Sequence, residues 1–353
     1  MDSQASNSRV ESETDRSTAE LSLGVIGKRL LLAFAAMAVL AVPAVIVGMA
    51  WNPAGTSVVI LGSILALATT ATAGYRAGVS AVVALLLLTP LALVAGLLPI
   101  AGACLMAVMC LMSGATALWG LHVAFRMVPL YIAFLMLSPP VFNGVAAEPL
   151  SSAYVLSASV MLAIGALWVL LLARPFLSRL PRRELTHNPL SATVVYTTAT
   201  TVLCSVSTLI VLMIDAGHAG AWLIMTLLIV MQVAPTATLD KTGQRLGGTV
   251  LGAVLAAGIS FVATTTAGLA AWALVMMVAA MTVFTGPRYW LYVTFLTPAV
   301  ILLSSSPGDV LRLDAQRLGY TAIGAVLAAA TSGGVFWYQR KRAAEQPSPS
   351  VAE

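Results

Sequence analysis

Two arginines of the sequence occur in the same local pattern, which is suited to binding a carboxylate within a membrane. The string QRLGGTVLGA contains Arg245, and the string QRLGYTAIGA contains Arg317. A guanidinium group holds a carboxylate through two parallel hydrogen bonds. In the first string, Gly248 and Gly252 lie four residues apart, so a neighbouring helix can approach closely there. The pattern predicts arginines at helix contacts that bind an organic anion.

Each arginine also has a structural interpretation. Arg245 is either an anchor at the cytoplasmic edge of a membrane helix or a residue that faces a cavity. Arg317 falls on the opposite side of the membrane from most basic residues. It is therefore expected either to pair with Asp309 or Asp314, or to contact an anionic substrate.

Further polar residues and prolines within the apolar stretches predict a polar path. Proline removes a helical hydrogen bond, and the freed carbonyl is tolerated at membrane depth only against protein or water. The prolines expected to break helices are Pro139, Pro140, Pro235 and Pro298. The alternative interpretation of these prolines is that they kink the helices only to improve helix packing. The residues expected to bind substrate, besides Arg245 and Arg317, are Arg126, Arg288, Gln232, Thr236, Ser138 and Thr297.

One carboxylate is the candidate for moving a proton. Asp240 lies close to Lys241 and Arg245 in the sequence, and we expect it to be buried at the cytoplasmic face. An intramembrane carboxylate of this kind either couples transport to protons or forms an ion pair with its basic neighbours.

The remaining reactive side chains are scattered along the chain. The three histidines and three cysteines show no metal-ligand spacing, and the sequence contains no Gly-rich phosphate-binding loop. An integral membrane enzyme usually gathers His, Asp or Glu at one interface. The sequence therefore predicts no enzyme activity, no metal site and no cofactor.

The chain that positions these residues consists largely of apolar stretches. Hydrophobic residues make up 59% of its 353 residues and charged residues 9%, whereas about 25% are charged in an average soluble domain. Stretches of about 20 residues cross a ~30 Å hydrocarbon core as helices. An all-α integral membrane protein is predicted. Its twelve expected transmembrane helices cover residues 30–50, 57–74, 79–98, 101–121, 127–141, 153–173, 193–214, 219–238, 246–264, 268–285, 289–305 and 317–338.

Basic residues predict the orientation of these helices. Loops rich in Lys and Arg face the cytoplasm, and nearly all basic residues fall on one side of the predicted layout. An even number of helices then places both termini in the cytoplasm. The net charge of +5 is explained by this orientation, and we expect no binding to nucleic acid.

The two sets of six stretches resemble each other. The string TATAGYR at 70–76 corresponds to TATLD at 236–240, and Arg126 and Arg288 open corresponding stretches. Units with an even number of helices have the same orientation, as in parallel-repeat transporters. Chance similarity between apolar stretches is the alternative. The expected organisation is a disordered tail (1–28), a first repeat (29–174), a cytoplasmic linker (175–192), a second repeat (193–339) and a cytoplasmic tail (340–353).

The two arginine–glycine strings resemble the motif of the fusaric acid resistance and aromatic acid exporter superfamily. The resemblance implies six-helix units in the bacterial inner membrane that export aromatic or other hydrophobic carboxylic acids. It also implies a periplasmic membrane-fusion protein as a partner. The chain lacks the large cytosolic domain between the halves of longer members, so it resembles the short branch.

The expected function is proton-coupled efflux of aromatic or other amphipathic organic acids. The expected partners are a small organic anion and the lipid bilayer. A major-facilitator-type carrier, suggested by the string DKTGQR at 240–245, and a passive organic-anion channel are alternatives. A non-transporting assembly scaffold is an alternative of another class. The sequence leaves the substrate, the coupling ion and the oligomeric state open.

Overall fold

The computed structural model describes residues 23–52, 55–140, 142, 151–177, 187–283, 288–305 and 308–345. Most of both predicted tails and the centre of the predicted linker (1–22, 346–353 and 178–186) lie outside the described residues. Within the described ranges the chain forms helices and no strand.

Twelve helices of at least 11 residues follow one another in these ranges. The first six are α2 (Leu23–Ala50), α3 (Gly55–Ala73), α4 (Tyr75–Ala95), α5 (Pro99–Ala115), α7 (Met127–Leu137) and α8 (Ser152–Leu177). The short helices η1 (Thr116–Trp119) and α6 (His122–Phe125) precede α7. The second six are α9 (Leu190–Met213), α10 (Gly217–Val230), α11 (Pro235–Val262), α12 (Thr266–Val283), α13 (Tyr289–Ser304) and α14 (Val310–Glu345).

Eight of the described helices are long and apolar enough to cross a membrane. The prediction of an all-α membrane protein with many spans is confirmed to this extent. The other four apolar segments, Ala38–Ala50, His122–Leu137, Ala219–Val230 and Tyr289–Leu303, are shorter. The full count of twelve crossings therefore stays a prediction.

Helix boundaries differ from the predicted ones where polar residues continue a helix. The stretches predicted at 219–238 and 246–264 are α10, which ends at Val230, and α11, which begins at Pro235. Pro235 takes the first turn of α11, where proline is favoured because its missing N–H is not needed. Hydropathy locates the apolar part of a helix and does not detect its polar first turns. As a result, Arg245 lies inside α11 and not at its edge.

The prolines predicted to break helices mostly lie at helix ends. Helix α7 ends at Leu137, so Pro139 and Pro140 follow the helix and do not interrupt it. Pro235 begins α11, which corrects the prediction of a break in the preceding helix. Pro298 lies inside α13 as expected.

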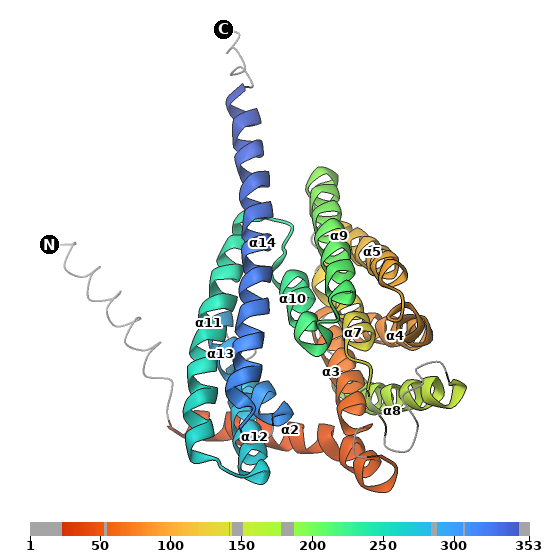
Figure 1. The fold of residues 1–353 in the computed structure, drawn as a ribbon, viewed down its shortest axis with the longest axis vertical. Helices are drawn as coiled ribbons and strands as arrows, with labels where there is room; N and C mark the ends of the chain where they lie inside the picture. The colour runs from red at the N-terminus through yellow and green to blue at the C-terminus, as the bar shows by residue number, and fades with distance from the viewer. Residues whose placement is uncertain are drawn as a thin grey trace, which may run out of the picture.

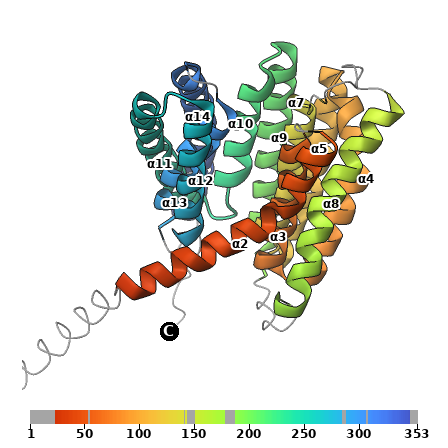
Figure 2. The same ribbon diagram turned by 90° about the horizontal axis from the view of Figure 1, so that it is seen from below.

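The helices form two groups with α10 between them (Figures 1 and 2). Helices α11–α14 form one group, and α3–α5 with α7–α9 form the other. Helix α2 crosses beneath both and packs against α3 and α12. Helix α5 packs against α9, and α10 packs against α14 on one side and α7 on the other. The chain halves are thus connected through several helix pairs.

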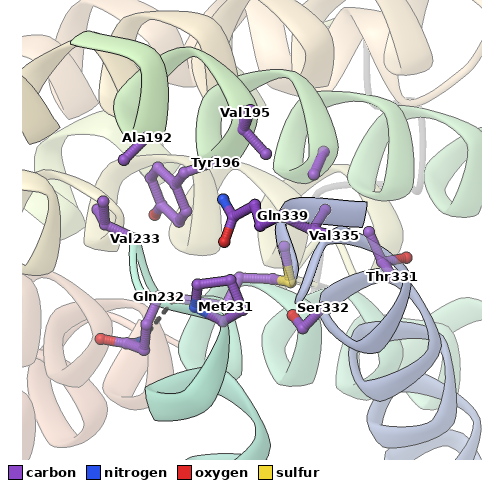
Figure 3. Close-up of a pocket in the computed structure, with 12 residues that line it drawn as sticks. Ala192, Val195, Tyr196, Met231, Gln232, Val233, Thr331, Ser332, Val335 and Gln339 are labelled. Carbon is purple, nitrogen blue, oxygen red and sulfur yellow. Dashed lines mark hydrogen bonds between the residues drawn. The ribbon is translucent and has the colours of Figure 1, made fainter. Parts of the chain in front are cut away.

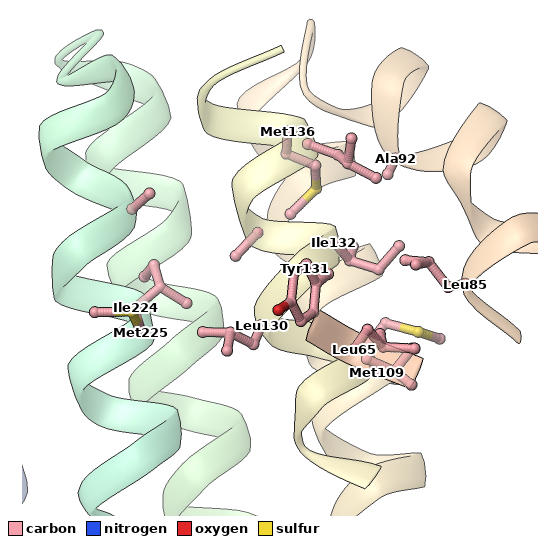
Figure 4. Close-up of a cluster of buried hydrophobic side chains, with 14 of the residues drawn as sticks. Leu65, Leu85, Ala92, Met109, Leu130, Tyr131, Ile132, Met136, Ile224 and Met225 are labelled. Atoms are coloured by element: carbon pink, nitrogen blue, oxygen red, sulfur yellow. The ribbon is translucent and has the colours of Figure 1, made fainter. Parts of the chain in front are cut away.

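The apolar core lies around α7, where side chains of α3, α4, α5 and α10 meet (Figure 4). Leu65, Leu85, Ile132 and Ile224 are completely buried there. The outward faces carry large exposed apolar residues such as Phe261 on α11. Contiguous exposed apolar faces of this kind fit contact with lipid.

Small residues bring α11 close to α13. A Cβ atom added to Gly248 would lie 2.6 Å from the carbonyl oxygen of Trp290, and one added to Gly252 would lie 2.6 Å from Cβ of Thr297. Such distances are too short for any side chain to fit without moving the backbone. The close approach expected at these two glycines is confirmed. It places α13 directly beside the arginine of α11.

Candidate anion-binding site

Three arginines are buried in the middle of the bundle, on three different elements. Arg126 precedes α7 and is 5% exposed, Arg245 on α11 is 1% exposed, and Arg317 on α14 is 2% exposed. The charge of Arg317 acts on that of Arg245. Lys241, one turn before Arg245, interacts electrostatically with both Arg126 and Arg245. We call Arg126, Lys241, Arg245 and Arg317 the basic cluster.

Arg126 and Gln232 complete the C-terminal end of α10. The Nη1 atom of Arg126 donates to the carbonyl oxygen of Ile229 at 3.0 Å. The amide of Gln232 donates to the same oxygen at 3.1 Å and to that of Met231 at 2.6 Å. The last carbonyls of a helix have no partner within the helix, and a basic side chain there also opposes the helix dipole. A helix that ends inside the bundle needs such partners.

Arg245 reaches α13 and α10 because it lies in the third turn of α11. Its Nη1 atom donates to the hydroxyl of Tyr289 at 3.2 Å, and its Nη2 atom lies 3.9 Å from the sulfur of Met225. The Lys241 ammonium lies 5.2 Å from the centroid of the Tyr289 ring. Arg126 also interacts electrostatically with Tyr289. The phenol of Tyr289 is therefore surrounded by three cations.

Arg317 lies on an aromatic surface. Its guanidinium carbon is 4.0 Å from the ring centroid of Trp222, and Phe134 packs edge-on against the same indole at 5.8 Å. Its Nη1 atom donates to the carbonyl oxygen of Thr297 at 3.4 Å. Stacking of this kind fixes the plane of the guanidinium group, whose buried Nε atom has no described hydrogen-bond partner.

Arg317 and Asp314, one of the predicted ion pairs, interact electrostatically but do not form a hydrogen bond with each other. Asp314, one turn earlier on α14, interacts electrostatically with Arg317. Its buried Oδ1 atom nevertheless has no hydrogen-bond partner among the described residues. Asp309 is exposed just before the start of α14. A single carboxylate that does not contact the guanidinium group offsets only part of the charge of the basic cluster.

The three guanidinium groups lack a carboxylate contact in the described part of the chain. Their partners are backbone carbonyls, a phenol, a thioether sulfur and an indole ring. The Nε atom of each arginine is buried and has no described hydrogen-bond partner. A buried charge costs several kcal/mol unless it is paired. These unpaired donors make the basic cluster the candidate site for an anion.

Of the other predicted site residues, Thr297 and Gln232 lie at the cluster. Thr297 is fully buried beside Arg317. Arg288 is exposed at the start of α13, Thr236 is exposed on α11, and Ser138 is half-buried at the end of α7. The structure therefore brings together Arg126, Arg245, Arg317 and Thr297, with Gln232 next to Arg126.

The expectation that Asp240 is buried is wrong. The residue is exposed on α11, and its Oδ2 atom accepts a hydrogen bond from Gln244 at 2.9 Å. Because α11 is continuous from Pro235, Asp240 lies on a different face of the helix from Arg245. Its role in proton coupling stays a prediction.

Sequence reasoning missed the aromatic residues of the site, above all Trp222 and Tyr289. Trp222 lies within an apolar stretch, and Tyr289 begins one, so each is explained equally well by packing or by an interface position. The one available signal was the string that contains Arg288 and Tyr289, which matches Arg126 in the first half.

A small pocket lies beside α9 (Figure 3), and its lining residues do not include the four members of the basic cluster. The link between α10 and α11, the C-terminal part of α14 and the first turns of α9 form its walls. Tyr196, Gln232 and Gln339 bring polar groups to it. Tyr196 interacts electrostatically with Arg126 behind the pocket. Among the described residues, no group of three or more His, Cys, Asp or Glu is placed to hold a metal ion.

Replacing Gln232 by alanine should lower the stability of the protein by about 1–2 kcal/mol, because carbonyls at the end of α10 lose a buried donor. The measurement is thermal unfolding of the purified protein in detergent. Gln244→Ala serves as the control, since the amide of Gln244 donates to the exposed Asp240. An equal effect of both substitutions would contradict the capping role of Gln232.

Comparison with known proteins gives one match. Residues 203–331 match a family model described as "Fusaric acid resistance protein-like". The matched segment contains Trp222, Arg245, Tyr289 and Arg317 of the site. No curated protein matches the chain. No solved structure matches it either. The resemblance inferred from the arginine–glycine strings is confirmed over this segment.

Proposed function

Since the chain contains a fusaric acid resistance protein-like segment in a bundle of membrane-spanning helices, we propose that it exports aromatic or other amphipathic organic acids and uses the proton gradient to do so. The observation that carries this proposal is the set of three buried guanidinium groups that lack a carboxylate contact among the described residues. The proposed location is the bacterial inner membrane. The proposed partners are the organic anion, the bilayer and a periplasmic membrane-fusion protein.

The surroundings of Arg317 suit both ends of an aromatic acid. We propose that the carboxylate accepts hydrogen bonds from the guanidinium group, including its buried Nε atom, which has no described partner. The aromatic ring of the substrate packs against the wall made by Trp222 and Phe134. Thr226 and Thr321 each have a buried hydroxyl with no hydrogen-bond partner among the described residues. These hydroxyls are available to polar substituents on the ring.

Short helices support a path through the bundle at the cluster. Helices α7, α10 and α13 have 11, 14 and 16 residues, which correspond to about 16, 21 and 24 Å, less than a ~30 Å hydrocarbon core. Helix ends at membrane depth are tolerated only against protein or a water-filled cavity. Residues of all three helices, or directly before them, contact the cluster. The path we propose therefore runs past Arg126, Tyr289 and Trp222.

Packing also supports two parallel repeats, and the positions of the basic residues in the sequence support termini in the cytoplasm. Helix α4 packs against α7 and α8, and the corresponding α11 packs against α13 and α14. Contacts between the halves occur in a corresponding pair, α5 with α9 and α12 with α2. Such reciprocal pairs are expected from a two-fold axis along the membrane normal. The site is then formed mainly by the second repeat, with Arg126 contributed by the first.

The test is transport by the purified full chain in proteoliposomes, with fusaric acid as the probe and its uncharged carboxamide as the control. We expect fusaric acid to accumulate beyond the level reached in protein-free liposomes when a pH gradient is imposed, and the carboxamide not to. Equilibration without accumulation would indicate a passive channel. Equal movement of both compounds, or of neither, would contradict the proposal. Asp240→Asn tests the coupling role: accumulation should fall while equilibration continues.

A further inference from the structure

The basic cluster contains two positions of different character. Around Tyr289 lie Arg126, Lys241 and Arg245, all within electrostatic range of its phenol or in contact with it. Around Trp222 lies one cation, Arg317, against an aromatic wall. The Tyr289 position is thus rich in charge, and the Trp222 position is rich in apolar surface.

One organic acid cannot neutralise both positions. The cluster has four positive groups, and Asp314 is the acidic residue that interacts electrostatically with Arg317 among the described residues. A monocarboxylate at Arg317 adds one further negative charge. The guanidinium groups of Arg126 and Arg245 then still have no described carboxylate partner in a buried site, where like charges repel strongly. A second anion at this position would relieve the repulsion.

The Tyr289 position offers hydrogen-bond donors suited to a small anion. The Nε atoms of Arg126 and Arg245 are buried and have no described partner. The hydroxyl oxygen of Tyr289 accepts a hydrogen bond from Arg245, so its own proton is available to donate elsewhere. These donors come from three different elements. The Tyr289 ring lies beneath the Lys241 ammonium and packs against Tyr292, so the groups left to bind a ligand are the phenol proton and the two Nε atoms, which suit a small inorganic ion.

We propose that a small inorganic anion of the chloride type binds at the Tyr289 position at the same time as the organic acid binds at the Trp222 position. The inference rests on the cluster used in the proposed function and extends it to a second ligand. One consequence is that the affinity for the organic acid depends on the inorganic anion. The bound inorganic anion screens the cations without competing for Arg317.

The experiment measures thermal unfolding of the purified full chain in uncharged detergent, in sodium chloride and in sodium gluconate at equal ionic strength. Chloride should raise the midpoint of unfolding by about 5 °C, because a ligand bound only to the folded state stabilises it. Tyr289→Phe keeps the ring and removes the hydroxyl, and should require about tenfold more chloride for the same shift. Arg317→Gln should keep the chloride shift and lose the shift caused by fusaric acid. Arg76→Gln, an exposed arginine at the start of α4, should keep both shifts.

The outcomes separate this inference from the proposed function. If fusaric acid stabilises the protein and chloride does not differ from gluconate, the second anion is disproved and the transport proposal stands. If chloride stabilises the protein and fusaric acid has no effect in either salt, the second anion stands and the organic-acid proposal fails. If chloride stabilises the wild type, Tyr289→Phe and a doubly substituted Arg126→Gln/Arg245→Gln protein equally, the anion binds elsewhere and the inference is overturned.

Discussion

Replacing Arg317 by glutamine should lower the transport of fusaric acid about tenfold to hundredfold. The substitution removes the charged donors of the carboxylate and the cation on Trp222, and hydrogen bonds to a charged group contribute about 1.5–3 kcal/mol each. Arg317→Lys keeps the charge but loses the planar fork and the stacking, so we expect an intermediate loss. The measurement is initial uptake into proteoliposomes at several substrate concentrations.

The control for this prediction is Arg76→Gln, because Arg76 is exposed at the start of α4 and far along the chain from the cluster. It should leave uptake unchanged. Glutamine at position 317 removes the buried charge but also the stacking on Trp222 and the charge near Asp314, so thermal unfolding must show that the variant is folded before its transport is compared. Full transport activity in a folded Arg317→Gln protein would show that the carboxylate binds elsewhere.

Replacing Gly248 by valine should destabilise the protein by about 2–4 kcal/mol and abolish transport. The new side chain would meet the backbone carbonyl of Trp290 at 2.6 Å, so α11 and α13 must separate. Separation moves Tyr289 and Thr297 away from the arginines they contact. Circular dichroism during heating and the proteoliposome assay measure the two effects.

The neighbouring residue supplies a matched control. Gly247 lies on the same turn of α11 and is exposed, and a Cβ atom added there would have no atom of the protein within 4 Å. Gly247→Val should change the midpoint of unfolding by no more than about 2 °C, since surface substitutions usually contribute within 0.5 kcal/mol. Equal destabilisation by both substitutions would mean that helix propensity, and not the approach of α13, explains the effect at Gly248.

Much of the helical layout follows from the sequence because apolar length is a local property. Each predicted stretch overlaps a described helix of at least 11 residues, and the stretch at 219–238 overlaps both α10 and the start of α11. The predicted helix ends are wrong where polar residues extend a helix, as in the first turns of α11 from Pro235. Hydropathy does not distinguish a polar helical turn from a loop. The same error explains why Asp240 was expected next to Arg245 in a loop, whereas the helix places the two on different faces.

The site was predictable in part. The strings around Arg245 and Arg317 contain the two most buried arginines, and glycine spacing indicates where α13 approaches. The partners of these arginines come from distant segments, such as Trp222 on α10 and Tyr289 on α13. No local pattern shows which aromatic residue of an apolar helix faces a cation. The exposure of Arg288 and the capping role of Gln232 likewise depend on how the helices pack.

The crossing of α2 beneath both helix groups has a consequence for biosynthesis. Leu23–Ala50 leaves the ribosome well before one of its packing partners, Thr266–Val283, is made. At about 5–20 residues per second, the early segment waits roughly 10–40 s for that partner. During this interval its α12-binding face is covered only by lipid or by the insertion machinery. Assembly of the molecule is therefore completed only after translation of the late segment.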